Sequence, residues 1–181
     1  MKIALHDNDN TGFPNLALMK LSAFHKSNGD SVEWFNALSR SEYDRVYSSK
    51  IFTWSKHDPY LPNDTICGGT GFLSTGVRSL PEMVDEITPD YSLYNIIYGL
   101  GFLTRGCIRK CKHCFVPETE GYIRPYSKIE EIINPLSKEV ILMDNNVLAS
   151  DWGISQIEKI ARLGIKIDFN QGLDARFGIE H

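Results

Sequence analysis

Short apolar runs alternate with helical apolar patterns through the first part of the chain. Leu16, Met19 and Ala23 recur at helical spacing, Pro14 suits the first turn of that helix, and Gly29 suits its end. The pattern predicts strands at residues 2–5, 31–35, around 46–47 and at 65–67, with helices at residues 14–29 and 81–87.

Strand–helix alternation of this kind implies a parallel sheet, so we expect residues 1–92 to form a small α/β domain of the Rossmann-like class. Such domains bind ligands at the carboxyl ends of their strands. The polar residues 6–12 and the glycine-rich residues 68–71 each follow a predicted strand. These two loops therefore mark the edge of the sheet where a ligand is expected.

A second alternation begins near Tyr94 and predicts that residues 93–181 form the first half of a βα barrel, with three strands. Ser127 and Glu130 have the spacing of a capping box at the start of its first helix. The predicted strands are 96–103, 139–143 and 165–169, and the predicted helices are 127–133 and 154–164. Because the helix due after the last strand is missing, we expect the chain to be truncated within this barrel.

Composition is close to the globular average, with 42% hydrophobic and 23% charged residues in 181. The net charge of -4 argues against a general nucleic-acid-binding surface. The sequence has neither an apolar run of about 18 residues nor a signal-peptide pattern. We therefore expect a cytoplasmic protein that makes no contact with a membrane.

Three of the four cysteines are clustered, at Cys107, Cys111 and Cys114, which favours metal binding over a disulfide framework. Structural metal sites are usually closed, whereas catalytic sites keep one coordination position free. Iron–sulfur clusters are normally held by four cysteines, so a loop with three indicates a cluster with one iron left for another ligand. Cys67 follows an apolar pair, and we expect it to be a small buried residue.

The spacing C-x3-C-x2-C after a predicted strand, with Thr104-Arg105-Gly106 before the first cysteine, resembles the cluster loop of the radical S-adenosylmethionine (radical SAM) superfamily. The resemblance implies a partial TIM barrel, a [4Fe-4S] cluster on Cys107, Cys111 and Cys114, and SAM bound to the open iron. It also implies reductive cleavage of SAM to start radical chemistry, with an electron donor such as flavodoxin or ferredoxin. The substrate and the reaction are unknown, because fold and cofactor do not fix them.

The same resemblance implies cofactor-binding roles for polar residues of the loop and of the second and third strand ends. His113 stands where the family usually has an aromatic residue near the SAM adenine. The segment Asp144-Asn145-Asn146 stands where the family often has Gly-Gly-Glu, and Asp144 and Asn145 are its predicted cofactor-binding residues. Asn170, Gln171 and Arg176 follow the third strand. A polar turn at residues 144–146 and a structural Asp174–Arg176 pair are the alternatives.

A second hypothesis is a non-enzymatic α/β binding module in which Cys107, Cys111, His113 and Cys114 hold a structural zinc ion. The spacing disfavours it, because the adjacent His113 and Cys114 are awkward as simultaneous tetrahedral ligands. A third hypothesis is a fragment that binds a cluster but cannot cleave SAM.

Residues 1–92 resemble, more weakly, the cobalamin (B12)-binding-like domain that precedes the barrel in many radical SAM proteins. The likeness rests on the α/β pattern, on Gly68 and Gly69, and on Pro81 and Pro89. The Asp-x-His-x-x-Gly motif that supplies a cobalt ligand is absent, since Ala23 precedes His25 where the motif has Asp. Cobalamin bound without a protein ligand and an empty structural domain both remain open.

Overall fold

The computed structural model describes residues 1–75, 80–174 and 176–177. The chain forms two compact units, Met1–Tyr94 and Asn95–His181, and their boundary lies next to the one expected between residues 92 and 93. In the described ranges, no helix is both long enough and apolar enough to cross a membrane.

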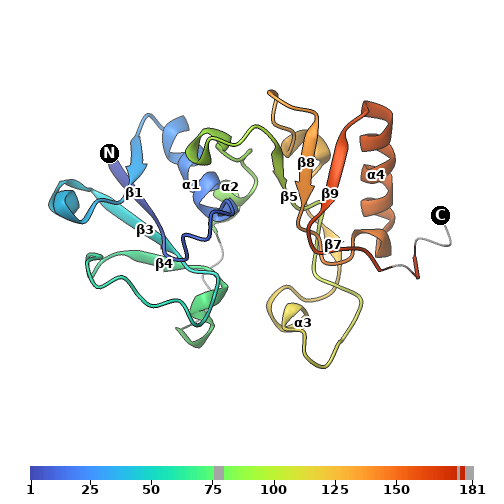
Figure 1. The fold of residues 1–181 in the computed structure, drawn as a ribbon, viewed down its shortest axis with the longest axis horizontal. Coiled ribbons are helices and arrows are strands. Elements are labelled where there is room, and N and C mark those ends of the chain that lie inside the picture. Colours follow the sequence, from blue (N-terminus) through green and yellow to red (C-terminus); the bar gives the residue numbers. More distant parts are fainter. Residues whose placement is uncertain (76–79, 175, 178–181) are drawn as a thin grey trace. The chain divides into compact units, whose positions relative to one another are not determined.

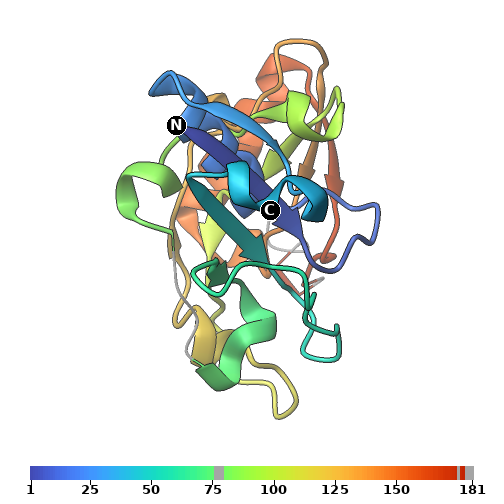
Figure 2. The same cartoon turned by 90° about the vertical axis from the view of Figure 1, so that its left-hand side faces the viewer.

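The first unit contains a four-stranded sheet in which every neighbouring pair of strands is parallel (Figures 1 and 2). The strand order is β2-β1-β3-β4. The chain adds β2 on one side of β1 and then β3 and β4 on the other side, so the strand order reverses between β1 and β3. The parallel α/β arrangement confirms the predicted class, and the reversal is the place where such sheets bind ligands. The strands are β1 (Lys2–Asp7), β2 (Ser31–Trp34), β3 (Arg45–Ser49) and β4 (Ile66–Gly68).

Helix α1 (Leu16–Ser27) packs on this sheet, with Leu18 in one buried cluster with Ile3 and Leu5. Asn15 caps it by accepting a hydrogen bond from the Leu18 amide at 3.3 Å, and its own amide donates to Ser49 Oγ at 2.8 Å. Pro14 therefore precedes the N-cap, and its predicted place in the first turn is wrong. The shorter helices are η1 (Ala37–Glu42), η2 (Thr70–Thr75), α2 (Glu82–Asp85) and η3 (Tyr91–Tyr94).

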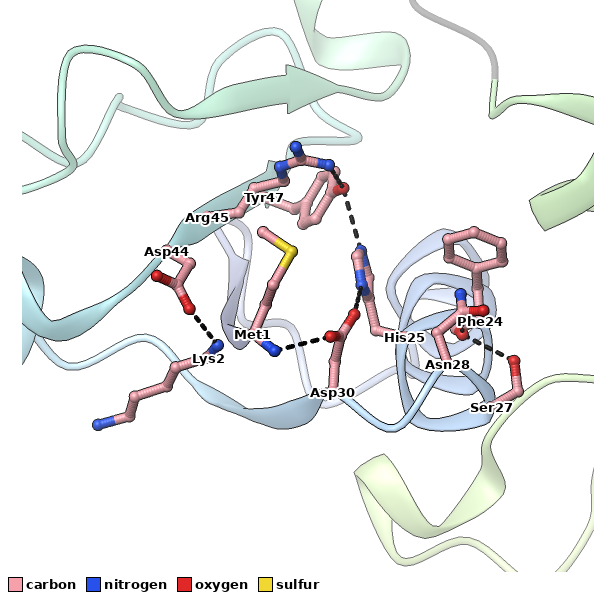
Figure 3. Close-up of polar contacts among 10 residues, drawn as sticks. All are labelled: Met1, Lys2, Phe24, His25, Ser27, Asn28, Asp30, Asp44, Arg45 and Tyr47. Atoms are coloured by element: carbon pink, nitrogen blue, oxygen red, sulfur yellow. Dashed lines mark hydrogen bonds and ion pairs between the residues drawn. The ribbon is translucent and has the colours of Figure 1, made fainter.

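A polar network around the buried His25 joins the end of α1 to the amino-terminal side of the sheet (Figure 3). His25, only 4% exposed, contacts Asp30 through Nδ1 at 2.7 Å and the Tyr47 hydroxyl through Nε2 at 3.0 Å. Asp30 also accepts from the Met1 amino group at 2.8 Å, and hydrogen bonds from that group and from His25 lower the pKa of Asp30. Both ring nitrogens of His25 are thus engaged within the fold, so its role here is structural.

The second unit contains a three-stranded parallel sheet in the order β5-β8-β9 (Figure 1). Helix α4 (Asp151–Leu163) connects β8 to β9 and contributes Ile160 to the core beside Val140 and Leu142. Ser150 caps its start, and Gly164, with φ 64°, ends it in the left-handed conformation that favours glycine. The sheet strands are β5 (Gly99–Gly101), β8 (Glu139–Leu142) and β9 (Lys166–Phe169).

The connection from β5 to β8 is mostly irregular. It holds the antiparallel pair β6 (Thr104–Arg105) and β7 (Arg124–Pro125), the short helix α3 (Val116–Thr119) and the 3-10 turn η4 (Ile129–Glu131). The helix predicted at 127–133 is therefore only one turn, and Glu131 rather than Glu130 accepts the capping bond, from Lys128 N at 2.9 Å.

Candidate metal and cofactor site

Polar residues follow the carboxyl ends of the three parallel strands of the second unit. Thr104 lies three residues after β5, residues 144–146 follow β8, and Asn170, Gln171 and Asp174 follow β9. The cysteine loop begins directly after β6, which follows β5 in sequence. Side-chain hydrogen bonds connect this loop to the residues after β8 and after β9.

Asp144 joins the end of β8 to the chain that leaves β5. Its Oδ2 accepts from Leu103 N at 3.0 Å, and its Oδ1 accepts from Thr104 N and Thr104 Oγ1, both at 2.6 Å. The side chain is 3% exposed, and burial raises the pKa of Asp144 although these hydrogen bonds act in the opposite direction. The observed contacts of Asp144 are structural, and its role as an acceptor for the SAM ammonium stays a prediction.

Asp144→Asn should remove a pH-dependent part of the stability. The folded-state pKa of Asp144 is raised above its unfolded value of about 3.9. Its contribution to stability is therefore full below that value and declines as the pH rises through the folded pKa. Chemical denaturation of both proteins between pH 4 and 7 should show the free-energy advantage of the natural protein over the variant shrinking as pH rises. An advantage that grows with pH would contradict the raised pKa.

Glu120, which the sequence did not single out, fastens the start of the cysteine loop. One oxygen, Oε2, accepts from Gly106 N at 2.9 Å and from Asn145 Nδ2 at 3.1 Å, and the other pairs with Arg105 at 3.1 Å. The Arg105 guanidinium also lies over the Phe102 ring, 4.0 Å from its centroid. Asn145, predicted to bind a cofactor, thus holds the loop through Glu120.

The three clustered cysteines are free thiols, with Cys107 half-buried and Cys111 and Cys114 exposed. Cys107 Sγ lies 3.4 Å from Arg109 N and 4.0 Å from Asn146 Nδ2. Cys111 and Cys114 lie at the two ends of one turn, in which Cys114 N donates a hydrogen bond to Cys111 O at 3.0 Å. Within the residues that the structure describes, no group of three His, Cys, Asp or Glu side chains is arranged to hold a metal ion.

Asp174, after β9, accepts from two arginines. Arg109 of the cysteine loop donates through Nε at 3.1 Å, and Arg176 donates through Nε at 2.7 Å and Nη2 at 2.8 Å. Hydrogen bonds from Arg176 first, and from Arg109 as well, hold the pKa of Asp174 well below its usual range. Asp174 in turn raises the pKa of Arg176, through its hydrogen bonds and its charge. The Asp174–Arg176 pair, the alternative given above, is present, and carboxylate binding by Arg176 stays a prediction.

His113, Asn170 and Gln171 are all exposed. Asn170 N donates to Leu142 O at 3.0 Å and so extends the pairing of β9 with β8. The side chains of these three residues are available to a ligand, but their predicted cofactor contacts stay predictions.

The loops at the carboxyl ends of the first unit's strands are held by internal contacts. His6 contacts Ser48 Oγ at 2.9 Å and Asp58 at 3.2 Å, and burial lowers the pKa of His6. Gly69, with φ 101°, lies so close to Lys50 that a Cβ would stand 2.3 Å from the Lys50 carbonyl oxygen. Gly69 therefore has a steric reason within the fold.

No protein-family model matches the sequence, and no curated protein matches it. The functional interpretation therefore depends on the cysteine spacing and on the contacts of the cysteine loop.

Proposed function

We propose that the second unit is the first part of a radical SAM (βα) barrel and that Cys107, Cys111 and Cys114 hold a [4Fe-4S] cluster. The observation that carries the proposal is the attachment of the cysteine loop to the ends of the other two strands. Asn146 of the β8 end faces Cys107, and Arg109 of the loop pairs with Asp174 after β9. Parallel βα sheets place their reaction sites at this edge.

In number and chemistry the three thiols suit the cluster. They would supply three of the four iron ligands and leave the fourth iron for the amino and carboxylate groups of SAM. Lys110 and Lys112 of the loop would offset the negative charge of such a centre, whereas Arg105 and Arg109 already pair with Glu120 and Asp174. When bound, the cluster would pass one electron, received from a donor such as flavodoxin or ferredoxin, to SAM and so start radical chemistry on a substrate of unknown class.

The chain's own residues would position these groups. Asp144 fixes the backbone of Leu103 and Thr104, which leads into the loop, and Glu120 fixes Gly106 directly before Cys107. Arg109 is shared with Asp174, so a carboxylate ligand would compete with Asp174 for an arginine near the cysteines. Exposed His113 offers a planar ring for stacking on an adenine.

Anaerobic reconstitution of the full chain with iron and sulfide tests the proposal. We expect about four iron and four sulfide per chain, and a change in the EPR spectrum of the reduced cluster when SAM is added. Stoichiometric zinc after aerobic purification, without sulfide uptake, would overturn it in favour of the structural zinc module. A cluster that binds without formation of 5′-deoxyadenosine from SAM would identify an inactive fragment.

For the first unit, we propose a cobalamin-binding-like domain. Its support is the parallel sheet with a reversal of strand order between β1 and β3. Cobalamin would bind without a histidine ligand, because His25 is engaged by Asp30 and Tyr47. Titration with hydroxocobalamin, followed by visible absorbance and gel filtration, tests this, and an empty structural domain would retain none.

A further inference from the structure

Asn146, the fourth residue after the end of β8, has a side-chain position that the local fold does not explain. It is 3% exposed and stands at the N-cap of the short turn η5 (Val147–Ala149), where its backbone oxygen accepts from Ala149 N at 3.1 Å. Asparagine is among the strongest N-cap residues because its side chain normally accepts a hydrogen bond from the following turn. Here the side chain makes no such bond to any described residue. Its orientation therefore has another cause.

The side chain is directed at the first cysteine of the loop. Asn146 Nδ2 lies 4.0 Å from Cys107 Sγ. The same sulfur also accepts a hydrogen bond from Arg109 N at 3.4 Å. A thiolate accepts hydrogen bonds and cannot donate them, so only the NH2 end of the amide suits this contact. The other end, Oδ1, is buried and has no hydrogen-bond partner in the described part of the chain. A buried amide left half-satisfied costs stability, which is typical of a functional position.

The two preceding residues are already engaged elsewhere. Asp144 is saturated by the backbone of Leu103 and Thr104, and Asn145 donates to Glu120. Of the three polar residues that follow β8, Asn146 is thus the one whose side chain contacts a thiol of the cysteine loop.

We propose that Asn146 is a positioning residue that donates a hydrogen bond to the Cys107 sulfur and raises the reduction potential of the cluster bound there. The inference rests on the proposed function. Reduction adds negative charge to the cluster and its cysteine sulfurs, and a hydrogen-bond donor stabilises the more negative state. The Asn146 side chain is buried, and burial strengthens a hydrogen bond that it donates. The contact is long, so we expect its removal to shift the potential without abolishing cluster binding.

The test compares three variants of the full chain after anaerobic reconstitution, by redox titration of the visible absorbance. Asn146→Leu removes the donor at similar volume, and Asn146→Asp keeps the shape but places a carboxylate beside the sulfur. The matched control is Asn134→Leu, because Asn134 is another buried amide of the same unit, 2% exposed, whose NH2 donates to Ile96 O at 3.1 Å. We expect a more negative midpoint potential for Asn146→Leu, a larger shift for Asn146→Asp, and no shift for Asn134→Leu.

Two results would overturn the inference while leaving the proposed function intact. One is an unchanged potential in Asn146 variants that carry full iron. The other is loss of iron in both Asn146 variants while Asn134→Leu retains it, which would make Asn146 a requirement for cluster assembly. Failure of the natural chain to take up iron would instead overturn the proposed function, and the inference with it.

Discussion

Replacing any one of Cys107, Cys111 and Cys114 with alanine should reduce the iron of the reconstituted chain from about four per molecule to less than about one. Three cysteines leave one coordination position open, and removal of another ligand leaves too few bonds to retain a [4Fe-4S] cluster. Iron and acid-labile sulfide, measured on the same gel-filtered samples, would follow the loss. Cys67→Ala is the matched control, because Cys67 belongs to β4 in the first unit.

A further variant separates this outcome from a zinc site. His113 is exposed, so His113→Ala should leave the fold intact. In the iron–sulfur interpretation this variant keeps its full iron and sulfide, because the three thiols suffice. In the zinc interpretation His113 is a ligand, so His113→Ala should bind zinc more weakly than the natural chain. Each of the three cysteine variants should also bind zinc more weakly. Full cluster content in Cys111→Ala or Cys114→Ala would contradict the three-thiol site.

The apolar runs at residues 2–5 and 139–143 correspond to β1 and β8, because buried parallel strands are nearly continuous in hydrophobic residues. The strand predicted at residues 31–35 corresponds to β2, most of whose residues are exposed. The helical spacing of Ile154, Ile157 and Ala161 likewise predicted α4, and Gly164 its end. Predictions were weaker where glycine and proline interrupt the pattern. The run 96–103 has only Gly99–Gly101 in a strand, and the helix predicted at 127–133 is the single turn Ile129–Glu131.

The candidate site shows the same division between local and long-range information. The cysteine spacing is local and could be recognised directly in the sequence. Glu120 and Asp144 act through bonds to backbone amides that lie 14 to 41 residues away in sequence, and no spacing rule encodes such pairs. Asp174 likewise pairs with Arg109 across 65 residues, so only the fold identifies it as an anchor of the cysteine loop.

The glycine before the first cysteine should be the most sensitive backbone position of the loop. Gly106 has φ 82°, and a Cβ there would lie 2.4 Å from Tyr122 O and 2.7 Å from Gly121 O, both of them backbone atoms. Gly106→Ala is therefore unfavourable for two reasons. Alanine disfavours the left-handed conformation, and its Cβ would clash with backbone atoms, which cannot move aside as a flexible side chain could. Moving that backbone would also disturb the hydrogen bonds of Gly106 to Glu120 and of Cys107 N to Gly121 O.

Gly121 supplies a close control, since it has φ 77° and no described atom lies within 4 Å of its Cβ position. Gly121→Ala should cost about 1–2 kcal/mol, the usual cost of the left-handed conformation. Gly106→Ala should cost about 2–5 kcal/mol, because overpacking against fixed atoms adds to the same conformational cost. Chemical denaturation measures the difference, and iron content shows whether Cys107 is displaced. Equal destabilisation by the two substitutions would mean that the loop has room at Gly106 and that Cys107 is not held by this close approach.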